Sequence, residues 1–521
     1  MRRLTFEVAE RVLPSAPERV DVACFVGFVR RRPHAPVSDA LLRYLSEQGW
    51  TAEPTPRVNP NEPLDALLDV PLPFESFSAF ERHFAWEARN GTEPDEATAL
   101  GAAVRSFFAQ GGRKCYVVRM GDPLPPEEAH DKRGDRLNRL LPGSRFPAPE
   151  GFDTPASPVD RATWHGLAHL FGLTDISFLC LPDLPEVFAE APKPRPEPHL
   201  PPAGEPQFVE CAPESGLSLN WQPPERTAPR CDITSYQEWA GFLFILSELL
   251  RSRLREVHLI AALPRPSPSL MFIGKTGRQA AEQDFGLFLQ TLGVLSTFQS
   301  AFIQLAWPWV ETSGSQRLPE RLEAPDGVLA GVLARNALLR GTFRSALGLP
   351  LADVRRVAPS LDRVDLTPRR TSTQLPSLVE RVSLLGPTPR GMHVLSDVTS
   401  SPLMAHRPAP VSRLISSVLR AARHVGLELA FSPSNESSWR ALRQRIEFVL
   451  GQFFEAGALR GATPQEAFSV RCDRSTMTQD DLDAGRMIAR VELEPAAVLE
   501  RIQVQLMVVE GGATRQQGEA A

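Results

Sequence analysis

The most informative segment of this chain, Pro408 to Glu510, opens with the run Val411-Ser-Arg-Leu-Ile-Ser-Ser-Val-Leu-Arg-Ala-Ala-Arg423. The apolar residues of this run recur at helical spacing, which predicts a helix with one apolar face. They are Leu414, Ile415, Val418 and Leu419, and the basic residues Arg413, Arg420 and Arg423 occupy the rest of the surface.

Downstream of this helix, the alternation at Leu427 to Phe431 predicts a short strand. A second helix is expected from Glu436 to Glu455, with Gly457 just past its end, where helices commonly stop. Arg486 to Leu493 and Arg501 to Val509 alternate and predict two strands. The segment therefore predicts a small helix-and-sheet domain.

These ordered elements resemble the C-terminal domain of the contractile tail sheath family, found in phages, R-type pyocin-like particles and other contractile injection systems. The resemblance rests on Trp439 to Phe454, Gly457-Ala-Leu-Arg-Gly-Ala-Thr-Pro464, Val470-Arg-Cys-Asp473 and Met477 to Gly485.

A second match lies near the other end of the chain. Cys24-Phe-Val-Gly27, Ser76 to Phe84 and Val104 to Arg119 predict a strand, a helix, and a helix that leads through Gly111-Gly112 into a strand. This order is typical of a crossover α/β unit, and it resembles the N-terminal part of tail sheaths.

Between these ends, Ile176 to Asp183, Phe302 to Trp309 and Pro325 to Arg335 resemble central sheath segments. The resemblance implies a multi-domain, mixed α/β (α+β) fold with a subtilisin-like, non-catalytic centre. The expected boundaries are an N-terminal arm (1–20), the first part of an inner lattice domain (21–121), a Pro-rich loop (122–160), a central domain (161–395) with a Pro-rich insertion (190–230), a C-terminal sheath domain (396–510) and a flexible tail (511–521). The N- and C-terminal parts are expected to form the lattice domain together, with the middle projecting outward.

Composition excludes several functional classes. A net charge of −5 gives no global reason to bind nucleic acid. The six cysteines are far apart and form no Cys-x-x-Cys, which argues against a disulfide scaffold or a zinc knuckle. The first residues lack a signal-peptide core, and no apolar run reaches the ~18 residues of a membrane span. We expect neither direct membrane insertion nor a cofactor.

Four motifs have a structural reading beside a chemical one. His165-Gly-Leu-Ala-His169 has a zinc-compatible spacing but lacks a protease glutamate and an evident third ligand. Ile273-Gly-Lys-Thr276 lacks the first glycine of a P-loop, and Asp480-Asp-Leu-Asp483 lacks the remainder of a calcium loop. Asp175, His258 and a serine could compose a triad, but no Gly-x-Ser-x-Gly anchors one. We therefore expect no enzyme, no catalytic residues and no metal site.

The function implied by the resemblance is mechanical. The chain would be a sheath subunit that polymerises helically around an inner tube protein, with baseplate and tail terminator proteins as further partners, and contracts to drive the tube through an envelope. It would assemble in a bacterial or host cytoplasm and then belong to a virion tail or to an extracellular or cell-bound particle. The alternatives are a non-contracting cap or baseplate-proximal component, and a hydrolase with a subtilisin-like domain.

Two sets of residues carry this expectation. Terminal strands would pair with neighbouring subunits, or instead within their own chain, through Leu4, Phe6, Val8, Ile502, Val504, Leu506 and Val508. The helix carrying Arg413, Arg420 and Arg423 would face the inner tube, where a basic stripe could meet acidic residues, or would simply be solvated.

Overall fold

The computed structural model describes residues 19–33, 35–51, 67–89, 96–141, 160–191, 227–267, 299–361, 378–429, 435–483, 486–496 and 502–508. The N-terminal strand residues Leu4, Phe6 and Val8, the motif Ile273 to Thr276 and the tail 511–521 lie outside them. So does most of the Pro-rich insertion 190–230. No described helix is both long and apolar enough to span a bilayer.

An eight-stranded sheet forms the body of the molecule, in the order β14-β13-β10-β8-β6-β1-β5-β3. The strands are β1 (Val22–Gly27), β3 (Pro71–Phe74), β5 (Cys115–Arg119), β6 (Ile176–Cys180), β8 (His258–Ala262), β10 (Ile303–Trp307), β13 (Ser383–Thr388) and β14 (Gly391–Val394). Each strand from β13 to β5 pairs in parallel with its neighbour, whereas β14 and β3 run antiparallel at the two edges. Continuous apolar runs such as Val22 to Val26 suit a parallel sheet covered on both faces.

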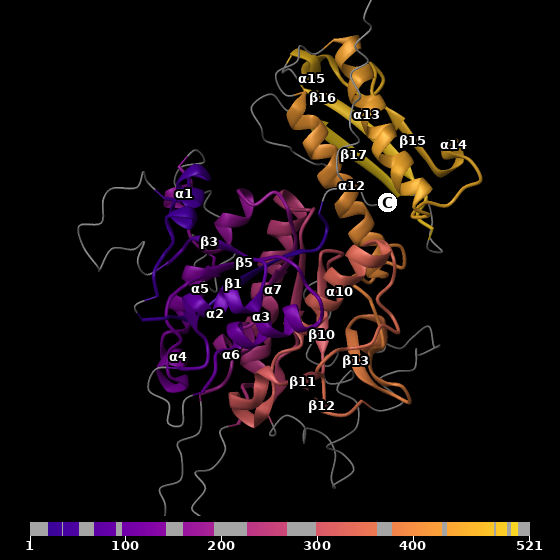
Figure 1. The fold of residues 1–521 in the computed structure, drawn as a ribbon. Helices are drawn as coiled ribbons and strands as arrows, with labels where there is room; N and C mark the ends of the chain where they lie inside the picture. The colour runs from indigo at the N-terminus through magenta and orange to yellow at the C-terminus, as the bar shows by residue number, and fades with distance from the viewer. Residues whose placement is uncertain are drawn as a thin grey trace, which may run out of the picture.

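The helices before Met404 pack around this sheet (Figure 1). They are α1 (Asp39–Glu47), α2 (Phe77–His83), α3 (Ala99–Ala109), α4 (Pro126–Asp131), α5 (Arg133–Leu140), α6 (Leu184–Val187), α7 (Ile233–Arg253) and α10 (Asp326–Arg340). Short polar residues cap several of them: Ser76 accepts from the Ala79 amide, and Thr98 from the Gly101 amide. Short two-stranded ladders flank the sheet: β2 (Arg30–Arg31) with β4 (Phe84–Ala85), β7 (Arg230–Cys231) with β9 (Arg265–Pro266), and β11 (Trp309–Glu311) with β12 (Arg356–Ala358).

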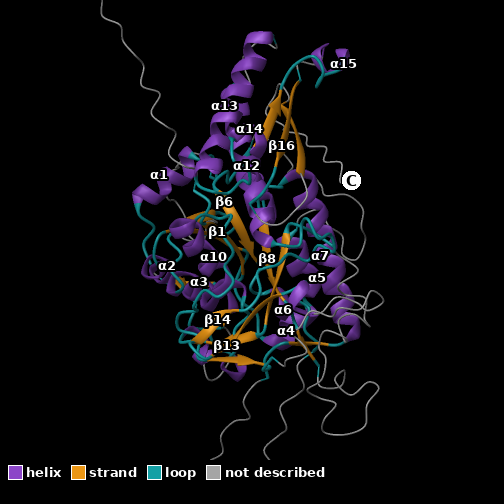
Figure 2. Cartoon of the chain, turned by 90° about the vertical axis from the view of Figure 1, so that its right-hand side faces the viewer, coloured by secondary structure: helices purple, strands orange, loops and turns teal. Residues whose placement is uncertain are grey.

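The C-terminal part has its own core. It contains α12 (Ala409–Glu428), α13 (Glu436–Glu455), α14 (Pro464–Ala467), α15 (Gln479–Asp483), β15 (Phe468–Arg471), β16 (Met487–Leu493) and β17 (Ile502–Val508). The strands form an antiparallel sheet in the order β15-β16-β17. Figure 2 shows α12, α13 and this sheet at one end of the molecule, above the large sheet.

Several expectations are confirmed and others are wrong. The apolar face of α12, the extent of α13 and the two last strands are as predicted. The predicted strand at Leu427 is wrong, because α12 continues to Glu428. The segment 122–160 was expected to be a loop, yet it contains α4 and α5.

The expected N-terminal lattice part (21–121) and the expected central domain (161–395) share one sheet in the structure. Strand β1 lies between β5 and β6 and pairs in parallel with both. Its side chains are fully buried, so it cannot leave this sheet without exposing an apolar core. The N-terminal strands therefore belong to the central sheet, and the C-terminal part stands apart.

Candidate functional site

Helix α12 has two differently built faces. Leu414, Val418, Leu419 and Ala422 are buried in the C-terminal core. The polar residues Arg413, Ser416, Arg420 and Arg423 recur at helical spacing on the face that contacts the central part of the chain. We call these four residues the clamp.

The clamp crosses the amino ends of adjacent central strands. Arg413 donates to Gln304 of β10, Ser416 bonds His258 of β8, and Arg420 donates to Ser177 of β6. Seven helical residues rise about 10 Å, which matches two strand spacings of about 4.8 Å each. The helix therefore presents one polar side chain to each successive strand.

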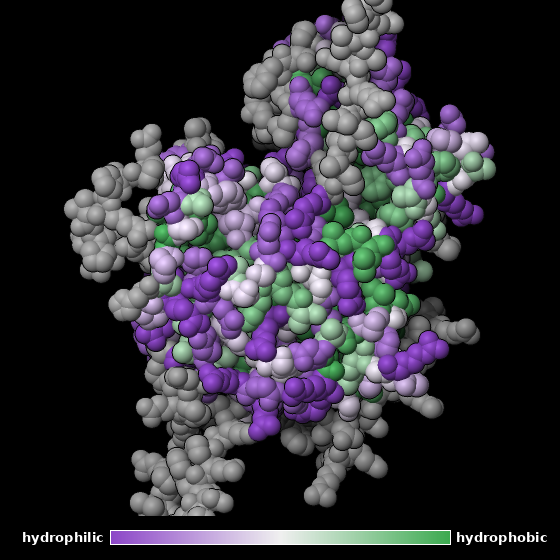
Figure 3. Space-filling view, viewed as in Figure 1, coloured by the Kyte–Doolittle hydropathy of each residue, from purple (hydrophilic) through white to green (hydrophobic). Residues whose placement is uncertain are grey.

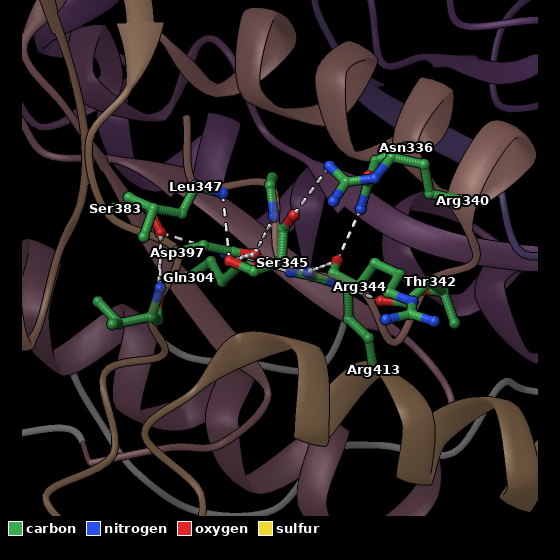
Figure 4. Close-up of polar contacts among 12 residues, drawn as sticks. Gln304, Asn336, Arg340, Thr342, Arg344, Ser345, Leu347, Ser383, Asp397 and Arg413 are labelled. Carbon is green, nitrogen blue, oxygen red and sulfur yellow. Dashed lines mark hydrogen bonds and ion pairs between the residues drawn. The ribbon is translucent and has the colours of Figure 1, made fainter. Parts of the chain in front are cut away.

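The central contact of the clamp is the ion pair between Arg413 and its partner Asp397 (Figure 4). The Arg413 Nη1 and Nη2 atoms donate to the two carboxylate oxygens of Asp397 at 2.9 and 2.8 Å. The side chains are 3% and 1% exposed. Asp397 also accepts from the Gln304 amide at 3.0 Å and from the Ala346 backbone N–H at 2.8 Å. A buried pair needs this full set of partners to offset the loss of hydration.

Burial alone would raise the pKa of Asp397. The Arg413 charge and the hydrogen bonds from Arg413, Ala346 and Gln304 outweigh that effect, so the pKa lies below its ordinary value. The carboxylate is therefore ionised, and the pair is a permanent charge pair at neutral pH.

The segment 341–347, between α10 and the rest of the central part, completes this centre. Arg413 Nε donates to the Thr342 carbonyl at 3.1 Å, and Asn336 of α10 donates to the Arg344 carbonyl at 2.7 Å. Phe343 packs against the C-terminal core. This segment thus contacts both parts of the chain at the clamp.

Apolar surface lies beside the joint, by which we mean the contact between α12 and the central part of the chain. Leu338 and Leu339, near the end of α10, are 47% and 76% exposed, and Figure 3 shows green surface where α10 approaches the base of α12. The joint therefore has a buried polar centre beside partly exposed apolar surface.

His258 and Ser416 form a buried contact with no catalytic character. Ser416 donates its hydroxyl proton to the Arg255 carbonyl at 2.8 Å, and so accepts from His258 Nε2 at 2.8 Å. Burial and the Arg413 charge lower the pKa of His258 to about 3, which leaves it too weak a base to activate a serine at neutral pH. Asp175 instead accepts from Lys114 and Tyr116. Phe178 is the residue that pairs with His258 in the sheet, and Asp175 lies about 10 Å of extended chain before it. Asp175 is therefore not beside His258. The structure does not bring Asp175 and His258 together in a triad.

Two of the three arginines expected to form a basic stripe on α12 are not exposed within the chain. Arg413 and Arg420 are buried, and Arg423 forms an ion pair with Glu256. Loop carbonyls and Asp397 attract these guanidinium groups because strand ends leave acceptors unpaired. A contact between α12 and an inner tube stays a prediction, but the Arg413 and Arg420 side chains are already engaged within the chain.

The other motifs have structural roles. His165 and the Gly166 amide both contact Asp69, at 3.1 and 3.0 Å. Asp481 of α15 accepts from Thr478, just before the helix, and from Arg486, which follows it. Within the described residues, no group of histidine, cysteine, aspartate or glutamate side chains is arranged to hold a metal ion. Five cysteines there are free and buried, namely Cys24, Cys115, Cys180, Cys231 and Cys472.

The edges of the central sheet are closed. Outward-facing positions of β3 carry Pro71 and Pro73, which have no N–H to offer another strand. On the opposite edge, the segment 348–351 already pairs with β14: the Gly348 amide donates to Val394 and the Leu351 amide to Met392.

The small sheet is built differently. β15 and β17 are its edges, and within the described residues no further strand pairs with either. β17, with Ile502, Val504, Leu506 and Val508, pairs with β16 of the same chain from Leu493↔Ile502 to Met487↔Val508. Intersubunit pairing of these residues stays a prediction.

Sequence reasoning missed Asp397, Gln304 and Glu256, the partners of the clamp. They lie in loops or single strand positions, and no local spacing connects them with α12. The regular spacing of serines and arginines on α12 was a usable signal in the sequence, because polar residues that recur at helical intervals indicate a second face of the helix.

No protein-family model matches the sequence, and no curated protein matches it. Solved structures do. The chain is similar to a chain of the anti-feeding prophage baseplate, with 16% identity and a TM-score of 0.53, over 95% of this chain and 94% of that one. It is similar to the anti-feeding prophage helical sheath in its contracted state, with 16% identity and a TM-score of 0.51, over 96% of both chains. A third match, to the contracted anti-feeding prophage baseplate, has 18% identity and a TM-score of 0.53 over 94% of both chains. The chain therefore has the fold of contractile sheath proteins, the family that its sequence resembles.

Proposed function

We propose that this chain is a structural subunit that polymerises with copies of itself into a contractile sheath around an inner tube. The observation that carries the proposal is the fold likeness to a contracted helical sheath over 96% of both chains. The likeness covers both the central and the C-terminal parts of the chain.

Strands at the chain ends are proposed to link the subunits. The N-terminal residues Leu4, Phe6 and Val8, and β17 with Ile502, Val504, Leu506 and Val508, would each add to the small sheet of a neighbour. The open edges of that sheet support this, as does the closure of both edges of the central sheet. The β16–β17 register formed within one chain is equally available between chains, as in domain swapping.

Contraction would repack the interfaces between subunits and leave the clamp intact. A buried, fully bonded ion pair is costly to open, whereas extended arms joined by main-chain hydrogen bonds can reorient. The inner tube, the baseplate and the tail terminator are the partners this proposal implies, within an extracellular or cell-bound particle. The net charge of −5 gives no reason to add nucleic acid to them.

The test is negative-stain electron microscopy of the full chain, alone and co-expressed with its genomic neighbours. Hollow striated cylinders in a long, narrow form and a short, wide form would support a contractile sheath. The variant Phe6→Pro, which removes a main-chain N–H from the proposed donor strand, should reduce cylinder formation, whereas Phe6→Tyr should not. Monomers under all these conditions would overturn the proposal.

A second candidate is a baseplate-proximal, non-contracting subunit. The similarity to two anti-feeding prophage baseplate structures favours it. Discrete rings of one diameter, without cylinders, would support this reading over the main-sheath one.

We also propose that the central domain is subtilisin-like in topology. The parallel strands from β13 to β5 support a doubly covered α/β sheet of that class. A structural superposition that aligns the strands in the same order would test it. This topology does not support a hydrolase function, because His258 is buried and weakly basic.

A further inference from the structure

Arg420, one of the clamp residues, contacts the first described residue of the chain. Arg420 Nη1 donates to the Arg19 carbonyl and to the Ser177 hydroxyl, both at 2.8 Å. Its Nη2 donates to the Glu256 carbonyl at 3.0 Å and also to the Ile176 carbonyl. The buried guanidinium therefore holds the chain before β1, the start of β6 and the loop before β8 together.

The contact with Arg19 fixes the place where the N-terminal arm begins. Arg19 also pairs with Asp21, which is fully buried, and β1 starts at the next residue. The chain at 19–21 is thus held by the central sheet on one side and by Arg420 on the other. In Figure 1 the first described residues, in indigo, pass beside α12.

The same helix contacts the other end of the chain. Val418, Leu419 and Ala422 of α12 are buried in the C-terminal core, and α12 lies against β17. Arg19 and Arg420 are 401 positions apart in sequence. The first described residue of the chain and its last described strand therefore both contact α12.

We propose that Arg420 is the residue that couples the N-terminal arm to the C-terminal domain, and that tension on the arm from a neighbouring copy of this chain passes through Arg420 into α12. This inference rests on the proposed function, in which the arm crosses to a neighbour. A fixed root limits the directions in which the arm can leave, so it raises the effective concentration of the donor strand at the neighbour's sheet.

The chemistry of the contact allows a selective experiment. Arg420 bonds the backbone of Arg19, so Arg19→Ala removes the Asp21 ion pair and keeps the anchor. Ser177→Ala removes the other partner of the same Nη1 atom and leaves the arm root in place. Arg420→Met removes the anchor with little change of volume. If Arg420→Met does not fold by thermal melting, Arg420→Lys takes its place, since lysine keeps the charge but cannot make the forked contacts.

Each full-length variant is measured for assembly by sedimentation and microscopy, and for amide hydrogen exchange at residues 19–22. We expect Arg420→Met to need about tenfold more protein to assemble and to exchange faster at 19–22, because an unanchored arm has a lower effective concentration. Ser177→Ala should assemble like the wild type, and so should Arg19→Ala if its thermal melting shows that it folds despite the loss of the partner of Asp21. A folded Arg420→Met or Arg420→Lys that assembles like the wild type, with unchanged exchange, would overturn the anchor.

The variant Phe6→Pro separates this failure from that of the proposed function. If Phe6→Pro assembles normally, the arm does not link subunits and the inference loses its basis. If Phe6→Pro blocks assembly while the Arg420 variants assemble normally, strand donation holds and the anchor alone is wrong.

Discussion

Arg413 and Asp397 meet in a two-pronged ion pair that is almost wholly buried between the central sheet and the C-terminal domain. Breaking one side of such a pair leaves an uncompensated charge, which costs about 3–5 kcal/mol. We therefore expect Arg413→Met and Asp397→Leu each to lower the unfolding free energy by about that amount, as measured in denaturant titrations. The double variant should lose less than the sum of the two single changes.

The control for this pair is Arg445→Met. Arg445 pairs with Glu428 at the surface, with side chains 48% and 65% exposed, so the loss should be about 0–1 kcal/mol. Equal losses for Arg413→Met and Arg445→Met would show that the buried pair contributes no more than a surface one.

Gly331 should not tolerate a methyl group. A Cβ there would lie 2.5 Å from the Phe107 carbonyl oxygen, because α10 packs closely on α3. Gly331→Ala should lower stability by about 1–3 kcal/mol in thermal or chemical unfolding, despite the better helix propensity of alanine.

Gly241→Ala is the matched helical control. A Cβ at Gly241 in α7 would meet nothing within 4 Å, so this change should stabilise the protein by about 0.5–1 kcal/mol. If both glycine variants shift the melting temperature in the same direction, the close contact between α3 and α10 does not determine the effect of Gly331→Ala.

Alkaline pH should weaken the fold through Glu323 and Asp326. Burial raises the pKa of both carboxyl groups to about 8, and like charges add to this: Asp326 and Asp353 near Glu323, and Asp183 near Asp326. The folded state thus holds protons that the unfolded chain releases near pH 4. The stability that these two carboxyl groups contribute to the fold is fully present below about pH 4 and is lost as the pH rises through about 8.

Glu323→Gln and Asp326→Asn mimic the protonated forms. Each should reduce the fall of melting temperature between pH 7 and pH 9, measured by calorimetry, while the exposed Glu455→Gln should leave the fall unchanged. A wild-type melting temperature that is constant over this range would refute the prediction.

Acid should act through His258. Burial, followed by the Arg413 charge, lowers its pKa to about 3, so the unfolded state binds a proton from about pH 6.5 downward and the folded state does not. Stability is complete above pH 6.5 and declines as pH falls toward the folded pKa. His258→Gln should flatten this decline in melting curves recorded from pH 7 to pH 4. His169, with a pKa also lowered to about 3, should contribute a similar slope that His258→Gln leaves in place.

Much of the fold could be predicted from local sequence. The buried run Val22 to Val26, the periodicity of α13 and the alternation in β16 each reflect packing within one element. What could not be predicted was the long-range pairing. Strand β1 joins the central sheet because β6 lies beside it, and nothing in either strand alone specifies that neighbour.

The contacts of the candidate site were even harder to predict from local sequence. Arg413, Arg420 and Arg423 were predicted to face an inner tube or solvent, but the structure buries the side chains of Arg413 and Arg420 within the chain. An arginine on a helix is usually solvated, and its burial depends on partners such as Asp397 and Glu256, which lie far away in sequence. The serines at 412, 416 and 417 on α12, all buried, were the available hint that this face packs against polar strand ends.

The two prolines of β3 have a consequence for the geometry of growth. Under the proposed function, a subunit whose larger sheet offers no edge for a further strand would accept donated strands only at the edges of the small sheet. Copies joined in this way would form an open network, in which neighbours could tilt and slide while remaining connected. A chain with an extensible central sheet would instead stack into a continuous ribbon, and a ribbon of that kind cannot shorten.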